Sequence, residues 1–415
     1  MCRNNPPSTL SGARMSFMNK SPQRVWNFHP ASFRLRAISF GFRKLVVGGP
    51  KPVRMLLISD GAAHTSEQQF APIDRHASLL RDRLGVVAQY RKLADALLMD
   101  SRALAGFDLV GLKLVFQTPA PEAERIAQHF AKALAGTGAK LVYFDGDDDS
   151  NIQYHGVISA VDLYVKKHMF ADDQAYLRRY LGKSNLTDHV AREHGASFAD
   201  DIIPTSGGLD RAELGKLHLG WNIALDDKIF DLSRHIGGVA KPARDIDISC
   251  RAYVQPSVWT HALRSGVLER MEAMSGRFNI LAPRDRVSQE KYYEEMLRSR
   301  ICVSPFGFGE ICWRDFEAIL CGCLLVKPDM GHVKTLPDLF VPGVTYVPVR
   351  WDYSDLETQC AHYLGNESER LRIVERASQA LLASLEPEWF LDSFARLLTR
   401  LSLAAPAEAS RLSNI

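Results

Sequence analysis

The chain has 415 residues, of which 46% are hydrophobic and 24% charged, with a formal net charge of +3. This length exceeds what one hydrophobic core usually serves, so two domains and an ordinary globular composition are expected. A transmembrane helix is not predicted, since no run of 18 apolar residues occurs, whereas the net charge argues neither for nor against nucleic acid.

Residues 1–50 differ in composition from the rest of the chain. They contain no Asp or Glu, and their Lys and Arg residues alternate with aromatic ones. One interpretation is a basic arm that touches anionic lipid at the membrane periphery. The other interpretations, favoured by composition alone, are a disordered leader and a start codon placed upstream of the true one at Met55.

Strands alternate with helices in the first half of the chain. Short apolar runs predict strands at residues 53–59, 108–116, 140–144 and 161–165. Helical periodicity predicts helices at residues 88–100 and 121–134. The pattern weakens over residues 176–242, where paired glycines interrupt it. Such alternation favours a parallel sheet with helices on both faces.

The alternation resumes in the second half. Strands are predicted at residues 246–254, 278–281, 301–304, 324–327 and 345–349. Helices are predicted at residues 260–274, 289–298, 310–321, from 354, at 369–385 and at 389–401. Two Rossmann-like, doubly wound domains in tandem would face each other across a cleft, into which the carboxyl ends of the strands open.

Residues 303–330, "VSPFGFGEICWRDFEAILCGCLLVKPDM", carry the strongest functional signal. A strand ending at Ser304 leads into a loop with Gly307 and Gly309, which lets the backbone approach a ligand closely. The free N–H groups at the start of the following helix, together with its dipole, predict a site for a phosphate or diphosphate.

The predicted helix adds three charged residues on one stripe. Glu310, Arg314 and Glu317 stand at i, i+4 and i+7 among apolar neighbours. Arg314 would bind phosphate oxygens, and Glu317 would accept hydrogen bonds from a ribose diol. The alternative is a ladder of ion pairs without a ligand. Lys327, at the end of the next strand, is a further phosphate candidate.

This segment resembles the donor-binding segment of glycosyltransferases of the GT-B fold, and most closely the exostosin-like, group 1 and CgeB-like members. The matching positions are Ser304, Pro305, Gly307, Gly309, Arg314, Glu317, Ala318, Gly322 and Cys323. The resemblance implies that Glu317 holds the nucleotide ribose and that Arg314 neutralises the leaving diphosphate. Gly309 stands where group 1 enzymes carry their first glutamate, so the exostosin-like arrangement is the better match. The resemblance covers residues 245–363, and the N-terminal half of the chain matches in architecture only.

The acidic run at residues 144–151, "FDGDDDSN", suggests three interpretations. Clustered carboxylates can bind Mg²⁺, but the resemblance implies that no metal is needed. A solvated turn is the plainest interpretation. The third is that Asp145 or Asp147 reaches the cleft and takes the proton of an acceptor hydroxyl, with His155 as a rival base.

Other catalytic classes lack their motifs. No GxSxG, GxxxxGK[ST], HExxH or CxxC sequence occurs, and no GxGxxG follows the first strand. The seven scattered cysteines predict reduced thiols in a cytosolic compartment and no zinc site.

The sequence therefore predicts a cytoplasmic, metal-independent glycosyltransferase without a cofactor, which moves a sugar from a nucleotide diphosphate sugar to a hydroxyl acceptor such as a surface glycan. Nucleic acid is not expected as a partner. The predicted parts are a basic arm at residues 1–50, an acceptor domain at 51–243, a donor domain at 244–385 and a C-terminal helix and tail at 386–415. The alternatives are a nucleotide-sugar epimerase on the same fold and a non-catalytic binding or assembly protein.

Overall fold

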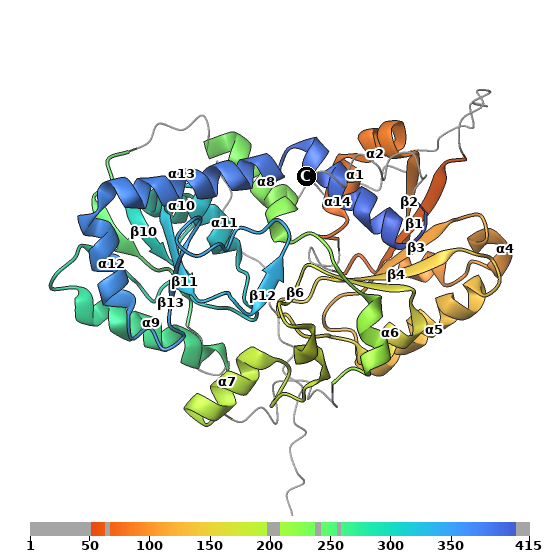
Figure 1. The fold of residues 1–415 in the computed structure, drawn as a ribbon, viewed down its shortest axis with the longest axis horizontal. Helices are drawn as coiled ribbons and strands as arrows, with labels where there is room; N and C mark the ends of the chain where they lie inside the picture. The colour runs from red at the N-terminus through yellow and green to blue at the C-terminus, as the bar shows by residue number, and fades with distance from the viewer. Residues whose placement is uncertain (1–50, 63–66, 197–207, 237–241, 255–258, 404–415) are drawn as a thin grey trace, which may run out of the picture.

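Two parallel β-sheets, each covered by helices, lie side by side in the molecule (Figure 1). The computed structural model describes residues 51–62, 67–196, 208–236, 242–254 and 259–403. The predicted basic arm at residues 1–50, with its membrane contact, lies outside the described residues. The prediction of an α/β chain with two tandem parallel-sheet domains is confirmed.

The N-terminal domain is built on a six-stranded sheet of order β2-β1-β3-β4-β5-β7. Its strands are β1 Val53–Ser59, β2 Val86–Lys92, β3 Leu109–Lys113, β4 Lys140–Asp145, β5 Leu163–Lys166 and β7 Leu217–Leu219. Its helices are α1 Ala71–Arg75, α2 Ala77–Leu84, α3 Leu93–Ala96, α4 Ser101–Leu104, α5 Ala120–Leu134 and α6 His155–Ala160, with the 3₁₀ segments η2 Asp173–Leu177, η3 Arg211–Lys216 and η4 Ile223–Leu225. Strands β3, β4 and β5 are buried almost throughout, which explains their continuous apolar runs.

One predicted element of this domain is wrong. The sequence predicts a helix over residues 88–100, but Val86–Lys92 forms β2 and only the short α3 follows it. Strand β2 is the edge of the sheet and pairs with β1 alone, so most of its side chains are partly exposed. Polar residues tolerated on such an edge interrupt the alternation that marks a strand, and the remaining apolar spacing resembles that of a helix.

The C-terminal domain is built on a five-stranded sheet of order β13-β11-β10-β8-β9. Its strands are β8 Ile246–Ser249, β9 Ile280–Leu281, β10 Ser299–Val303, β11 Leu324–Pro328 and β13 Val347–Val349. Its helices are α9 Thr260–Met274, α10 Gln289–Leu297, α11 Trp313–Leu320, α12 Leu356–Gly365 and α13 Glu367–Ser384. Helix α11 begins three residues later than the sequence predicts, with an extended Cys312 as its N-cap.

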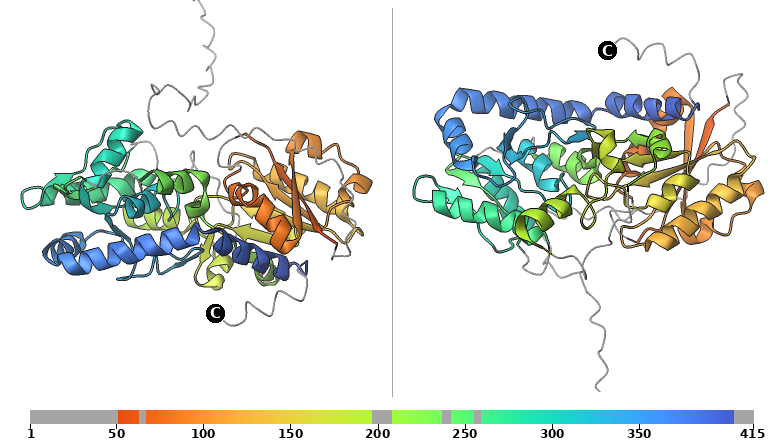
Figure 2. Two further views of the ribbon diagram at one scale, coloured as in Figure 1. Left: turned by 90° about the horizontal axis from the view of Figure 1, so that it is seen from above. Right: turned by 60° about the horizontal axis from the view of Figure 1, so that its bottom comes forward.

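Three helices pack away from their neighbours in sequence. Helices α7 Asn185–His194 and α8 Asp227–Ile236 contribute to the core around α11 in the C-terminal domain. Helix α14 Pro387–Arg400 crosses back and packs on the N-terminal sheet. In Figure 2, α13 and α14 follow one another along one side of the molecule and span both sheets. The domain boundaries predicted at residues 243 and 385 stay predictions, because packing does not follow sequence order at either one.

A small antiparallel sheet joins the domains. Strand β6 His168–Phe170 pairs with β12 Val333–Thr335, midway between the two large sheets (Figure 1). Beside it, the Asn222 amide N–H donates to the Leu336 carbonyl at 2.7 Å. The two domains are therefore held together by backbone hydrogen bonds as well as by side chains.

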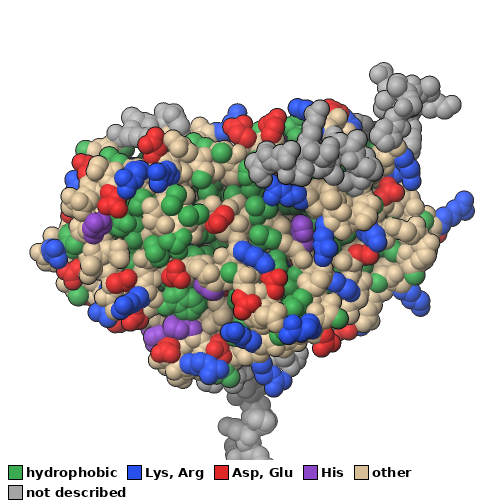
Figure 3. All heavy atoms as spheres, in the orientation of Figure 1, with side chains coloured by type: hydrophobic (Ala, Val, Ile, Leu, Met, Phe, Trp, Pro, Cys, Tyr) green, Lys and Arg blue, Asp and Glu red, His purple; other side chains and the backbone are tan. Residues whose placement is uncertain are grey.

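The surface mixes charges of both signs. On the face shown in Figure 3, Lys and Arg side chains are interspersed with Asp and Glu, and hydrophobic side chains gather over the C-terminal domain. Within the described ranges, no helix combines the length and the apolar character that crossing a bilayer requires.

Candidate active site

A cavity of about 520 Å³ lies between the two domains. Gln68 and Asp148 line it from the N-terminal domain, and the loops that follow β8 and β10 line it from the C-terminal domain. Its lining holds five basic side chains, Lys228, Arg251, Arg264, Arg286 and Arg314, and three acidic ones, Asp148, Asp285 and Glu317. The excess of positive charge favours an anionic ligand.

Arg314 lies in the first turn of α11 and lines the cavity. Its guanidinium donates to Ser304 Oγ at 3.0 Å and to the carbonyls of Arg251 at 2.8 Å and Pro305 at 3.0 Å. Three of its five N–H groups are thus used to hold the group in place. The other two have no partner among the described residues and can bind a ligand oxygen.

Glu317 lines the same cavity one turn further along α11 and is only 3% exposed. Its Oε2 accepts a hydrogen bond from Tyr292 at 2.8 Å, and its Oε1 accepts one from Tyr293 at 3.0 Å. Lys228 Nζ lies 2.7 Å from Oε1. These three donors hold the carboxylate at the wall of the cavity.

Glu310 does not belong to this stripe, which corrects the prediction. It precedes α11, is completely buried, and does not line the cavity. It accepts hydrogen bonds from the Ser150 amide and from Asn185 Nδ2, both at 3.1 Å. His168 Nε2 and His332 Nε2 each approach it at 3.4 Å, from opposite domains.

The pKa of Glu310 reflects this setting. Burial raises the pKa of its carboxyl, but the close imidazoles of His168 and His332 outweigh burial and hold that pKa well below its ordinary value. The Glu310 carboxylate is therefore ionised and links the two domains through these contacts. It lies outside the cavity lining and before the start of α11, so it does not form a helical ion-pair ladder with Arg314 and Glu317.

The two loop glycines have different surroundings. A Cβ at Gly309 would lie 1.3 Å from the carbonyl oxygen of Asp148, so this glycine lets the C-terminal loop touch the N-terminal domain. A Cβ at Gly307 would lie 3.1 Å from Arg264 Nη2 and 3.2 Å from Cys312 Sγ. Both glycines line the cavity.

Ser304 and Lys327 lie beneath the cavity wall. Ser304 Oγ donates to Asp315 while it accepts from Arg314, so it positions the guanidinium. Lys327 Nζ is completely buried and lies 3.1 Å from Asp315 Oδ2, with the Phe306 ring 5.0 Å away. Neither residue lines the cavity. The predicted phosphate ligand Lys327 is thus engaged in a buried ion pair in this structure.

The predicted acceptor-side acids are also engaged elsewhere. Asp145 Oδ2 lies 2.9 Å from Lys166 Nζ and accepts a hydrogen bond from Tyr164 at 2.9 Å. Burial raises the pKa of Asp145, but the charge of Lys166 and hydrogen bonds lower it to about 2. Asp147 pairs with Lys183. Neither acid lines the cavity, because lysines from other segments hold them inside the turn.

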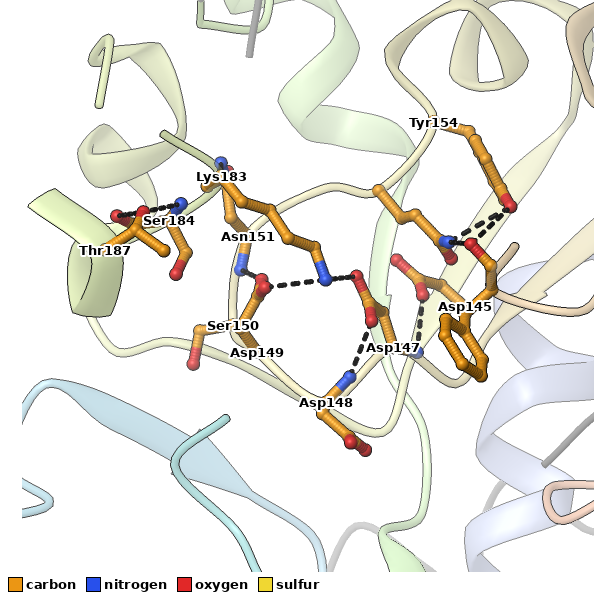
Figure 4. Close-up of polar contacts among 12 residues, drawn as sticks. Asp145, Asp147, Asp148, Asp149, Ser150, Asn151, Tyr154, Lys183, Ser184 and Thr187 are labelled. Atoms are coloured by element: carbon orange, nitrogen blue, oxygen red, sulfur yellow. Dashed lines mark hydrogen bonds and ion pairs between the residues drawn. The ribbon is translucent and has the colours of Figure 1, made fainter. Parts of the chain in front are cut away.

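Asp148 is the member of the acidic run that lines the cavity. Its Oδ1 accepts from Lys167 Nζ at 2.8 Å, and its side chain is 53% exposed. In Figure 4, Lys183 reaches between Asp147 and Asp149, whereas the Asp148 side chain points away from that cluster. Partial removal from solvent between the domains raises the pKa of Asp148, but the charge of Lys167 holds it below its ordinary value.

His155 lies apart from this group. It opens α6, does not line the cavity, and its Nε2 is buried without a hydrogen-bond partner among the described residues. Burial lowers the pKa of its imidazole. The structure does not bring His155 together with the other predicted site residues.

Several cavity residues were not predicted from the sequence. Arg251 lies two residues after the end of β8 and pairs with Glu295, and Arg264 Nη1 donates to the Tyr253 carbonyl at 2.8 Å. The guanidinium of Arg286 lies 3.9 Å from the centroid of the Tyr253 ring. Arg251 falls inside the strand predicted at residues 246–254, which runs past the end of β8 at Ser249, so the sequence did not mark it as a loop residue. Lys228 carries no sequence signal either.

The residues that the structure describes contain no group of three or more His, Cys, Asp or Glu arranged to hold a metal ion. The acidic run does not form such a group, because three lysines, Lys166, Lys167 and Lys183, neutralise it.

Two facing parallel-sheet α/β domains with a cavity between them define the GT-B architecture. Residues 261–395 match the model of a family described as glycosyl transferase-like. This match falls in the domain that contains α11 and confirms the predicted resemblance to GT-B glycosyltransferases there.

Solved structures that resemble the chain are distant. The Anabaena protein HepE, solved with UDP, is 10% identical and has a TM-score of 0.45, over 84% of this chain and 99% of its own. A glycosyltransferase from Rickettsia africae is 11% identical, with a TM-score of 0.42 over 85% and 99% of the two chains. An α-glucosyltransferase solved with UDP is 9% identical, with a TM-score of 0.44 over 83% and 99%. No curated protein sequence matches the chain.

Proposed function

We propose that this protein transfers a sugar from a nucleotide diphosphate sugar to a hydroxyl acceptor. The observation that carries the proposal is the cavity between the domains, which five basic side chains and Glu317 line together; a glycosyl transferase-like family model matches the C-terminal part of the chain. A nucleotide diphosphate sugar supplies the anion for these cations and the hydroxyls for the carboxylate.

The donor would lie against the C-terminal domain. The bond between the anomeric carbon and the diphosphate oxygen breaks, and negative charge grows on the leaving diphosphate. Arg314 lines the cavity with two N–H groups that no described residue binds, and Arg251 lies beside it, so both are placed to stabilise that charge. Glu317 would accept hydrogen bonds from the ribose, as the resemblance implies.

The acceptor would enter from the N-terminal side. Its hydroxyl oxygen forms the new bond to the anomeric carbon and loses a proton. Among the described residues, Asp148 is the carboxylate that lines the cavity from this side, so we assign it to the acceptor hydroxyl in place of Asp145 and Asp147. Lys167 orients the Asp148 carboxylate through its contact of 2.8 Å. We propose a cell-envelope or surface glycan as the acceptor, by analogy with the family.

Donor binding tests the proposal first. Thermal unfolding would be measured with UDP, GDP, ADP, CMP and dTDP, on wild type, Arg314→Ala and Arg286→Ala. A bound nucleotide at about 100 times its dissociation constant should add about 2.7 kcal/mol of stability. One nucleotide should stabilise wild type, and both variants should lose much of the effect. Arg286 is exposed and its side chain only covers Tyr253, so its loss should leave the fold intact.

Arg277→Ala is the matched control, because Arg277 is 62% exposed, pairs with Glu357 and lies outside the cavity lining. It should keep the full nucleotide response. No stabilisation of wild type by any nucleotide would contradict the proposal. Turnover then separates the alternatives: a transferase releases the nucleotide in proportion to added acceptor, whereas an epimerase converts the donor sugar without one.

A further inference from the structure

Lys228 is the cavity cation whose contacts differ from those of the others. It is the second residue of α8, and its side chain is 29% exposed. Its ammonium lies 2.7 Å from Glu317 Oε1 and 4.7 Å from the centroid of the Trp313 ring. The ammonium therefore lies at the cavity wall, beside the buried carboxylate.

The hydrogen bonds at Glu317 leave little room for a ligand. A carboxylate offers about four lone-pair sites, and donors from Tyr292, Tyr293 and Lys228 occupy three of them. A vicinal diol that donates two hydrogen bonds needs two sites, so one present donor must leave. Tyr293 is 1% exposed, and its ring packs 5.3 Å from that of Tyr292. Lys228, on a flexible four-carbon stem, is the donor that can move.

The displaced ammonium needs a new anionic partner, because leaving an ion pair without one is costly. Three of the other cavity cations already hold the protein itself: Arg251 pairs with Glu295, Arg264 donates to a carbonyl, and Arg314 uses three of its five N–H groups. A ligand that brings both a diol and a phosphate anion satisfies Glu317 and Lys228 together. A ligand with only one of the two groups leaves the other residue unpaired.

The backbone around Lys228 is fixed, so only the side chain has to move. The Lys228 amide donates to Asp226 Oδ1 at 2.8 Å. Asp227, the preceding residue, pairs with Arg75 of α1. The start of α8 is thus tied to the N-terminal domain while the lysine stem extends into the cavity.

We infer that Lys228 is a donor-binding residue, which leaves Glu317 and moves to the diphosphate when the nucleotide diol takes its place. The inference rests on the proposed function and extends it. Lys228 and Glu317 would together select ligands that combine a ribose diol with a diphosphate. Nucleosides and inorganic diphosphate would each bind less well than the joined molecule.

Calorimetric titration tests the inference. The ribonucleoside diphosphate that stabilises wild type most in the thermal panel, and the corresponding ribonucleoside, would be titrated into wild type, Lys228→Met and Lys228→Arg. Lys228→Met should weaken the diphosphate about tenfold or more, the size of one charge-assisted hydrogen bond. It should leave the nucleoside bound equally well or more tightly, because no ammonium then competes for Glu317. Lys228→Arg should keep diphosphate affinity within a few-fold.

Lys140→Met is the matched control, since Lys140 also pairs with a carboxylate, that of Asp162, but lies outside the cavity lining. Equal weakening of nucleoside and diphosphate by Lys228→Met would mean that Lys228 only supports Glu317, and would overturn the inference. Unchanged diphosphate affinity would overturn it as well, while the proposed function would stand. If wild type bound no nucleoside diphosphate, both would fall. Should Lys228→Met fail to fold, the double variant Lys228→Met/Glu317→Gln would remove both charges. If this double variant bound the diphosphate as tightly as wild type does, the inference would be overturned.

Discussion

Gly309 of the C-terminal domain lies directly against the main chain of Asp148 in the N-terminal domain. A Cβ at this glycine would stand 1.3 Å from the Asp148 carbonyl oxygen and 2.7 Å from the Asp149 nitrogen. Both clashes involve backbone, which cannot move aside as a side chain can. The contact sets how closely the loop after β10 approaches the acidic turn, and both Gly309 and Asp148 line the cavity.

Gly309→Ala should therefore separate the domains locally. We expect a loss of about 3 kcal/mol or more in the free energy of unfolding, because the added methyl group has no space to enter. Nucleotide binding should weaken in the same variant, since the cavity walls shift. Urea unfolding and calorimetry would measure the two effects.

Gly266→Ala provides the control for that change. Gly266 lies inside α9, and a Cβ there would meet nothing within 4 Å. Alanine in a helix interior is favoured over glycine, so this variant should be unchanged or about 0.5–1 kcal/mol more stable. If Gly309→Ala behaved like Gly266→Ala, the domains would not be in contact at this glycine.

Glu310→Gln should weaken the joint between the domains in a pH-dependent way. The change removes charge-assisted hydrogen bonds from a completely buried site, so we expect a loss of at least about 2 kcal/mol at pH 7. The native pKa of Glu310 is depressed, so its stabilisation is complete above its unfolded pKa of about 4.5 and is lost as the pH falls through the native pKa. Urea unfolding of both proteins at pH 7 and pH 3 would show a smaller difference at pH 3. An equal difference at both pH values would mean that the carboxylate charge plays no part.

The sequence predicts the parts of the site that are local in the chain. Ser304, Gly307, Arg314 and Glu317 belong to one strand–loop–helix unit, and their spacing survives in the structure because that unit folds as one piece. The same holds for most strands, whose apolar runs reflect burial on both faces of a parallel sheet.

Residues whose role depends on contacts between distant segments could not be assigned from spacing. From its spacing alone, Glu310 is predicted to lie on the helix. Only the structure shows that His168 from the other domain lies beside it. The acidic run shows several equivalent carboxylates, and lysines from β5 and from residue 183 decide which of them is left at the cavity. Lys228 meets Glu317 only because α8 packs in the C-terminal core.

Lys327→Met tests whether this lysine is structural, as its burial indicates. The variant leaves Asp315 as a buried charge without its ion-pair partner, which should cost about 3–5 kcal/mol of stability. The double variant Lys327→Met/Asp315→Asn should recover part of that loss, because the Asp315 carboxylate no longer carries an uncompensated charge. Nucleotide affinity of the folded protein should stay within a few-fold of wild type. A large loss of affinity without loss of stability would return Lys327 to the role of phosphate ligand.

Asp148→Asn tests the acceptor side of the proposed reaction. If the Asp148 carboxylate takes the hydroxyl proton, kcat should fall by about 10²–10⁴-fold, while nucleotide affinity stays within a few-fold. Asp285→Asn, the same change on the opposite wall of the cavity, should lower kcat much less. Because the pKa of Asp148 is below its ordinary value, its carboxylate stays ionised down to about pH 4, so its protonation should not limit the rate between pH 5 and pH 8. Unchanged kcat in Asp148→Asn would require another group to receive the proton.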